Sequence, residues 1–411
     1  MSVSTNMIAE GELRLRLDRI QSRALAAGGL GVFLSLAAWG FWPEQFLQHF
    51  LPSYLVAYAF WVGLALGCMG LTMLHHLVGG SWGLVVRRPM ESGGMTLLPL
   101  ALLFVPLALG LSRLYPWARP AEVAHDPQLQ HQSLYLNVGF YLVRTVGYFV
   151  IWFVLTFVLN RLSSDQDRRA DHRPSGRLQR LSGPGLVLLF LTGTFSAIDW
   201  LMSLEPHWSS TIYGCLVIVG EALATLAMMI AVVVFLSADQ PMAEAATPDR
   251  LNDLGNLMLA FTMLWAYMSF MQYLIIWSGN LPEEIPWYLR RTRGGWQWVA
   301  LALGLFHFFL PFFVLLFREN KRQSRLIVQV AILVLAMHWV DLIWLVVPAS
   351  SDPASPRIPW VELPLSLVAM LGIGGLCSAF FIRHLKGRPL IPLNDPHLNE
   401  VIEHAGGLGQ G

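Results

Sequence analysis

Residues Ile212 to Leu236 read IYGCLVIVGEALATLAMMIAVVVFL and carry one charged side chain, Glu221. A helix needs roughly 20 mostly apolar residues to cross about 30 Å of hydrocarbon, so this stretch is long enough to span a bilayer. In lipid every backbone polar group needs an internal partner, and a helix provides one within the segment itself. The stretch therefore predicts a transmembrane helix.

Nine further stretches of this kind are bounded by charged residues or by clusters of Pro and Gly. We therefore predict an all-α, polytopic membrane protein with about ten transmembrane helices. In chain order, the predicted spans are Ala24 to Trp42, Tyr54 to Leu77, Met95 to Leu114, Tyr135 to Leu159, Pro184 to Leu204, Ile212 to Leu236, Gly255 to Trp277, Trp296 to Phe317, Leu326 to Val347 and Trp360 to Ile382.

The composition excludes several other classes of protein. The chain has 411 residues, of which 55% are hydrophobic and 13% are charged, and this is too apolar for a soluble or a disordered protein. A net charge of +1 excludes nucleic-acid binding through a basic surface. Because Cys68, Cys215 and Cys377 lie far apart, the sequence predicts no disulfide framework and no metal site.

Positive charge is distributed unequally between the two sides of the predicted spans. Of 27 Lys and Arg residues, 20 fall on the side of the N-terminus, six fall on the opposite side and Arg144 falls inside a span. Cytoplasmic loops hold the excess of positive charge, so both termini are predicted to be cytoplasmic. Residues 1–23 are interrupted by charges and are predicted to form an amphipathic cytoplasmic helix rather than a signal peptide.

Ionisable residues at membrane depth are candidate functional residues, because burying one there costs at least about 2.5 to 3.5 kcal/mol. Two further candidates lie at the outer end of the fifth span. The residues inside spans are Arg144, Asp199, Glu221, His307, His338 and Asp341, and the two at the outer end are Glu205 and His207.

The depths of these residues indicate an internal repeat. At about 1.5 Å per residue, Arg144 can meet Asp199, and His307 lies at a depth like that of Arg144 while Asp341 lies at a depth like that of Asp199. This predicts two four-helix bundles, each with a basic group facing an Asp. The predicted parts are the N-terminal segment 1–23, a flanking span in 24–53, the bundles 54–204 and 212–347, a flanking span in 348–382 and a cytoplasmic tail 383–411.

Each group of candidates has more than one interpretation. The pair Arg144 and Asp199 is either part of a proton route or an ion pair that fixes helix register. His307, His338 and Asp341, with Glu221 facing the same interior, are favoured as a proton relay, because histidine changes charge near neutral pH. The alternative for His307 and His338 is a two-histidine haem site.

The loop Gly279 to Gly295 is predicted to dock a partner subunit. It carries Arg290, Arg291 and Arg293 on the side that is otherwise poor in positive charge. Three arginines there indicate an acidic partner.

Two passages carry a resemblance to a known family. Residues 195–214 read FSAIDWLMSLEPHWSSTIYG, and residues 265–288 read WAYMSFMQYLIIWSGNLPEEIPWY. They resemble the ActF family, the second polysulfide-reductase-type (NrfD-like) integral membrane subunit of bacterial alternative complex III, a quinol:electron-acceptor oxidoreductase. The likeness extends over nearly the whole chain and includes His307, His338 and Asp341.

The resemblance implies a subunit of the bacterial cytoplasmic membrane that has two four-helix bundles and no redox cofactor of its own. The implied partners are a paralogous NrfD-like membrane subunit, a periplasmic iron–sulfur subunit and multihaem cytochrome c subunits, with quinol as the substrate of the complex. A transmembrane proton route is implied through Asp199, Glu221, His307, His338 and Asp341, and no residue is assigned as catalytic. A pocket for a quinone head group beside a span is a further expectation, with quinone as a partner, although no quinone-site motif of the paralogue is matched. The alternative functions are a proton-coupled secondary transporter and a b-haem membrane cytochrome.

Overall fold

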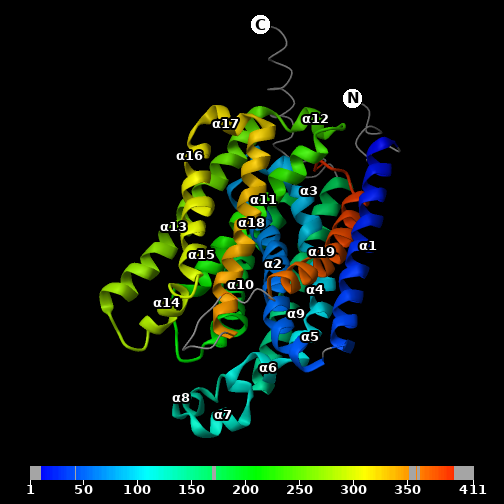
Figure 1. Cartoon of the computed structure of the whole chain (residues 1–411). Helices are drawn as coiled ribbons and strands as arrows, with labels where there is room; N and C mark the ends of the chain where they lie inside the picture. The colour runs from blue at the N-terminus through cyan, green and yellow to red at the C-terminus, as the bar shows by residue number, and fades with distance from the viewer. Residues whose placement is uncertain (1–10, 42, 169–172, 351–357, 359–361, 393–411) are drawn as a thin grey trace, which may run out of the picture.

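The computed structural model describes residues 11–41, 43–168, 173–350, 358 and 362–392. These residues form helices joined by short turns and contain no strand, so the predicted all-α fold is confirmed. Ten helices among them are long and apolar enough to cross a membrane, which confirms a multi-pass membrane protein (Figure 1).

Several spans are built from more than one helix. The third is divided into α3, α4 and α5, and the eighth consists of α15, a π-helical turn and α16. The helices are α1 Glu12–Phe41, α2 Pro43–Val78, α3 Trp82–Gly94, α4 Leu97–Leu103, α5 Val105–Leu109, α6 Leu111–Leu114, α7 Pro120–His125, α8 Pro127–Gln132, α9 Val138–Arg168, α10 Arg173–Trp200, α11 Tyr213–Leu236, α12 Met242–Ala245, α13 Pro248–Gly279, α14 Ile285–Arg291, α15 Trp296–Ala302, the π-helical turn Leu303–Phe309, α16 Leu310–Leu316, α17 Arg318–Arg322, α18 Ser324–Val346 and α19 Glu362–Lys386.

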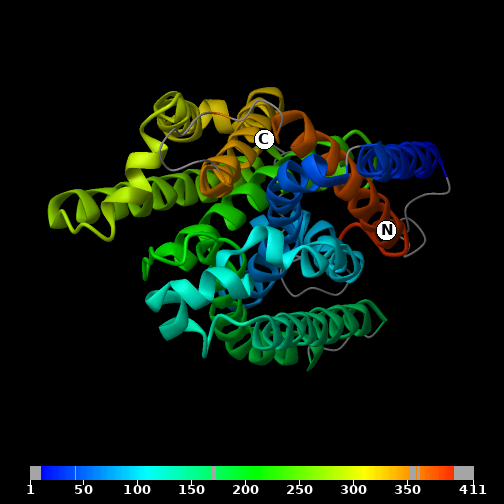
Figure 2. The same cartoon turned by 60° about the horizontal axis from the view of Figure 1, so that its bottom comes forward.

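Helix α2 lies at the centre of the molecule. It packs against α3 and α10 from its own predicted bundle, and against α11 and α18 from the other. Helix α9 packs on the outside of α10, α13 packs on α11, and α1 pairs with α19. We call the end that carries α12 and α17 the α17 end, and the end that carries α7 and α8 the α7 end (Figures 1 and 2). The division into two bundles and the membrane orientation stay predictions.

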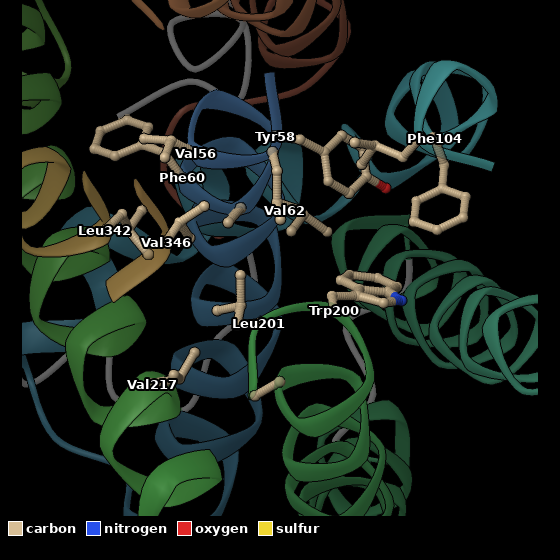
Figure 3. Close-up of a cluster of buried hydrophobic side chains, with 14 of the residues drawn as sticks. Val56, Tyr58, Phe60, Val62, Phe104, Trp200, Leu201, Val217, Leu342 and Val346 are labelled. Atoms are coloured by element: carbon tan, nitrogen blue, oxygen red, sulfur yellow. The ribbon is translucent and has the colours of Figure 1, made fainter. Parts of the chain in front are cut away.

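The buried core follows the two sides of α2. The ring of Tyr58 lies 5.6 Å from Phe104 and 5.9 Å from Trp200 of α10, measured between centroids. Phe60 lies on the other side, near Leu342 of α18 (Figure 3). All five of these side chains are buried, so one apolar core joins the helices on both sides of α2.

Helices α1 and α19 touch backbone to backbone. A Cβ added at Gly31 would lie 2.6 Å from the Cα of Gly372, and one added at Gly375 would lie 2.4 Å from the carbonyl oxygen of Ala24. In lipid, where apolar surface gives no driving force between helices, this close approach supplies van der Waals packing. It pairs the first and the tenth span.

The third span begins earlier than the sequence predicts. Helix α3 starts at Trp82 rather than at Met95, and it buries Arg87, Arg88 and Glu91, which read as part of a cytoplasmic loop. The turn before it uses Gly79 and Gly80, which both have positive φ. The two arginines therefore belong to the helical bundle, and the interpretation of them as loop charges is wrong.

Other boundaries also differ from the prediction. Residues 12–23 do not form a separate surface helix, because α1 continues without interruption into the first span. Leu13 and Leu17 are buried, one turn apart, while Arg14 is exposed. Helix α9 extends to Arg168, beyond the predicted Leu159. Residues 1–10 of the N-terminal segment and 393–411 of the predicted tail lie outside the described residues.

Candidate functional site

Arg144 and Asp199 meet at membrane depth, as their positions in the sequence predict. The guanidinium donates from Nε and Nη2 to the two carboxylate oxygens of Asp199, at 2.9 Å each. Asp199 has no exposed surface, and the Arg144 side chain is 10% exposed. This bidentate geometry is the strongest form of an arginine–carboxylate pair.

The surroundings of this pair satisfy both charges. Tyr148 donates its hydroxyl hydrogen to Asp199 Oδ2 at 2.8 Å, and Arg144 Nη1 donates to the carbonyl oxygen of Tyr135 at 2.9 Å. The guanidinium also lies 3.8 Å from the ring centroid of Tyr135 and 4.4 Å from that of Phe140. The carboxylate thus accepts three hydrogen bonds from two neighbours, and this favours the interpretation of the pair as structural.

His307 lies in the π-helical turn Leu303–Phe309 of the eighth span. Pro311 follows in the first turn of α16. Because proline has no N–H, the carbonyl of His307, four residues earlier, lacks its ordinary α-helical donor. Widened turns of this kind often mark functional positions in helices. The local sequence thus explains why the helix is irregular where a buried histidine lies.

Trp265 of α13 connects His307 to Asp341 of α18. Its ring stacks on the imidazole of His307 with centroids 4.3 Å apart and planes at 10°. Its Nε1 donates to Asp341 Oδ2 at 3.2 Å. The ring of His338 lies 6.5 Å from that of His307, at 89°. We call His307, His338, Asp341 and Trp265 the second-bundle cluster, and all four residues are buried.

The second-bundle cluster differs from the prediction in one respect. The sequence predicts a basic group facing Asp341, as Arg144 faces Asp199, but the side chain that contacts Asp341 is an indole. Within the described part of the chain Asp341 has no cationic partner, and the imidazoles of His307 and His338 have no side-chain hydrogen-bond partner. The two halves of the molecule are therefore chemically different at matching positions.

Glu221 does not join this cluster. Its side chain packs on Gly63 of α2, where an added Cβ would lie 2.7 Å from Glu221 Cγ. It lines a lateral cavity of about 160 Å³ with Phe190 of α10 and Phe261 of α13. The neighbouring Gly220, rather than Glu221, faces the imidazole of His338. The prediction that Glu221 shares the interior of the second bundle is wrong.

Glu205 is part of a buried ion cluster at the α7 end. Arg290 Nη1 donates to its Oε1 at 2.7 Å, and Arg291 Nη2 donates to its Oε2 at 2.8 Å. Arg291 also donates to the carbonyl oxygens of Trp287, Trp344 and Leu345, and it has no exposed surface. Burial lowers the pKa of Arg291, and the carboxylate of Glu205 opposes this shift.

This cluster corrects the predicted docking loop. Arg291 is buried and paired within the protein, Arg290 is paired with Glu205, and Arg293 is the exposed member of the three. An acidic partner therefore cannot bind all three arginines. The stacking of Trp208 on Trp287, with centroids 4.4 Å apart, fixes the same loop against the exit of α10.

His207 lies apart from Glu205, on the surface. Its Nε2 is 2.7 Å from Oδ2 of Asp126, and its side chain is 56% exposed. Slight burial raises the pKa of Asp126. The hydrogen bonds from the backbone N–H of Leu129 and from the imidazole of His207 lower that pKa by more, so it lies below its ordinary value. His207 is thus a surface partner of the α8 N-terminus rather than part of a buried route.

A buried network of charged residues at the α17 end was not predicted from the sequence. Glu91 accepts from Arg87 Nε at 3.0 Å, from Arg88 Nη1 at 2.6 Å and from Ser163 Oγ at 2.5 Å, while Arg388 Nη1 lies 3.4 Å away. The arginines bind further partners from α9, namely Gln166, Asp167 and Asn160. The signal that could have found it is the spacing of three and four residues between the two arginines and Glu91.

The fit of a haem between His307 and His338 can be tested from the packing. Trp265 covers the face of His307, Phe60 lies 5.7 Å from His338, and Gly220 lies against the same imidazole. A porphyrin between the two rings would displace these side chains, so the residues as packed do not fit the group. Among the described residues, no group of three or more His, Cys, Asp or Glu side chains is placed to hold a metal ion.

Comparison of the chain with protein-family models finds no match, and comparison with curated proteins finds no significant relative.

Proposed function

We propose that this chain is an integral membrane subunit of a quinol-oxidising electron-transfer complex of the alternative complex III type. The two passages that resemble the ActF family support this proposal, because residues from both of them form the buried ion pairs and ring stacks of the candidate site. Asp199, Glu205 and Trp208 come from the first passage, and Trp265 and Trp287 come from the second. The chain would lie in the bacterial cytoplasmic membrane with its α17 end facing the cytoplasm.

The partners in this proposal are those that the resemblance implies. A periplasmic iron–sulfur subunit and multihaem cytochrome c subunits would carry the electrons, and a paralogous NrfD-like subunit would lie beside this chain in the membrane. The periplasmic subunits would bind at the α7 end, where α7, α8 and α14 project (Figure 1). This chain would hold no redox cofactor.

The specific role that we propose is proton handling by the second-bundle cluster. Quinol oxidation releases two protons together with two electrons, so a complex that passes the electrons to external haems needs groups that accept the protons. The observation that carries the proposal is that Asp341 and two imidazoles lie buried together, with the indole of Trp265 in contact with Asp341 and His307 and with no cation among the described residues beside them. Histidine and an acid at membrane depth are the groups from which proton relays are built.

Replacing Asp341 by asparagine tests this role. The variant keeps an acceptor for the Trp265 N–H but cannot bind and release a proton, so quinol turnover is expected to fall by about 10²-fold. Proton release per quinol, measured with a pH dye in proteoliposomes that contain the whole complex, is expected to fall with it. The matched control is Glu244→Gln, an exposed acid of α12 at the α17 end, away from the proposed periplasmic surface, which should leave both quantities unchanged.

Assembly of the variant is checked by co-elution of the haem c subunits, and His338→Gln serves as a second variant of the same cluster. Normal turnover and normal proton release in both assembled variants would remove the relay. The Arg144–Asp199 pair would in that case be one of several structural ion pairs, and the chain would act as a scaffold.

A b-haem cytochrome is the second candidate, and two observations favour it. The rings of His307 and His338 lie 6.5 Å apart, and their nitrogens have no side-chain hydrogen-bond partner among the described residues. The packing of Trp265 and Phe60 against the rings argues against it. A secondary transporter has less support, because the interruptions after α4 and at the π-helical turn fall at positions that do not correspond in the two halves.

A further inference from the structure

An apolar groove of about 510 Å³ opens on the side of the molecule between α1, α2, α5 and α19. Leu36, Phe50, Val105 and Ile373 line it. Leu36 and Val105 are more than half exposed, so the groove is reached from the surface that lipid covers. An acyl chain from the bilayer can fill such a groove, and what it gains there is van der Waals contact with the walls rather than hydrophobic transfer energy.

A polar cavity of about 720 Å³ lies next to the groove, between α2, α6 and the end of α18. His49, Ser112, Arg119 and Ser350 line this cavity. Arg113 lines both the groove and the polar cavity. The two spaces therefore meet at one cationic side chain, with an apolar wall on one side and polar groups on the other.

The charge of Arg113 has no counter-charge in the part of the chain that the structure describes. Its side chain is exposed and forms no ion pair with any described residue. The neighbouring Arg119 is paired with Glu122 and donates to the carbonyl oxygens of Ser112 and Arg113. Arg113 is thus the cation that remains for a ligand, and guanidinium groups bind phosphate through paired hydrogen bonds.

From this juxtaposition we propose that the groove and the polar cavity form one binding site for an anionic phospholipid. The phosphate lies on Arg113 in the polar cavity, and one acyl chain lies in the groove between α1 and α2. A phosphate fits the unpaired cation better than a neutral quinone head group does, because a quinone brings no charge to it. The bound lipid fills the space beside the α1–α19 pair and joins the first and tenth spans to α2 and α5.

Native mass spectrometry of the purified full chain tests this proposal, with palmitoyl-oleoyl phosphatidylglycerol as the probe. We expect the wild-type chain to retain one such lipid after detergent washing. Arg113→Gln removes the charge and should weaken retention about tenfold. The control is Arg293→Gln, an exposed arginine near the same end that lines neither cavity, and it should retain the lipid normally.

The acyl-chain half of the site is tested by filling the groove. Val32 lines it, so Val32→Phe should lower lipid retention, whereas Val143→Phe, at an exposed position on α9, should not. Equal retention in both members of either pair would overturn the proposal. So would equal retention of a diacylglycerol without phosphate, preferential retention of a quinone, or displacement of the lipid by millimolar inorganic phosphate alone.

Discussion

Replacing Glu91 by glutamine is expected to destabilise the folded chain by about 3–5 kcal/mol, because it leaves buried guanidinium groups without their counter-charge. Glu91 is 3% exposed and accepts from Arg87 and Arg88 of its own helix, with Arg388 close to it. Glutamine has the same size but no charge, so packing is kept while three arginines face one remaining carboxylate, that of Asp167. The loss is measured as the free energy of unfolding in an SDS titration of mixed micelles.

The matched control is Glu122→Gln. Glu122 pairs with Arg119 at a spacing of three residues, as Glu91 does with Arg88, but both partners are about two-fifths exposed. A surface pair of this kind contributes about 0–1 kcal/mol, so the control should change stability little. If Glu91→Gln were as stable as Glu122→Gln, the buried network would not be holding α3, α9 and the segment after α19 together.

Replacing Asp199 by asparagine is expected to cost a similar 3–5 kcal/mol, because Arg144 then stays buried at membrane depth without its partner. Asp199 accepts hydrogen bonds from Nε and Nη2 of Arg144 and from the Tyr148 hydroxyl. An asparagine offers one carbonyl oxygen in their place, and its NH₂ group faces Arg144 Nη2 or Nε. Thermal unfolding followed by tryptophan fluorescence measures the loss.

Two further variants separate the ion pair from its surroundings. Tyr148→Phe removes one hydrogen-bond donor and should cost about 1 kcal/mol. The double variant Arg144→Met with Asp199→Leu removes both charges at once and should recover most of the stability that Asp199→Asn loses. A double variant as unstable as the single one would contradict a structural role for the charge pair, since it would show that the lost stability does not come from the uncompensated arginine.

The spans and one side-chain contact follow from the sequence. Long apolar stretches such as Ile212 to Leu236 predict membrane helices because the hydrocarbon thickness fixes their length, and ten such helices are present in the described residues. The depths of Arg144 and Asp199 predict that they meet, because both lie on neighbouring helices that must bury or pair their charges. Length and depth are properties that a linear sequence carries directly.

The buried charges of α3 could not be predicted in this way. Arg87, Arg88 and Glu91 look like residues of a cytoplasmic loop because three charges in five residues normally prefer water. They are tolerated inside the bundle because Ser163 and Gln166 lie opposite them, more than 70 residues further along the chain. Partners at that separation are brought together by the packing of α9 on the bundle, which no local pattern reveals.

The second-bundle cluster illustrates the same limit. Matching depths predict that Asp341 faces a basic group, but depth does not specify which face of a helix a residue occupies. The π-helical turn before Pro311 accompanies a His307 ring that lies against Trp265, and the indole contacts Asp341 in place of a cation. The position of Glu221 also differs from the prediction because of the helix face. Gly220 faces His338, and Glu221, one residue later, points to a different face of the helix.

We propose that this chain is a cofactor-free membrane subunit of a quinol-oxidising complex, and purification of the tagged chain from the membranes of its own organism checks this identity. The absorption spectrum of the eluate and the identity of its subunits are recorded together. We expect c-type haem and an iron–sulfur subunit to elute with the chain, and quinol to reduce that haem. Elution of the chain alone, or a reduced b-type band that stays with the isolated chain, would contradict the claim.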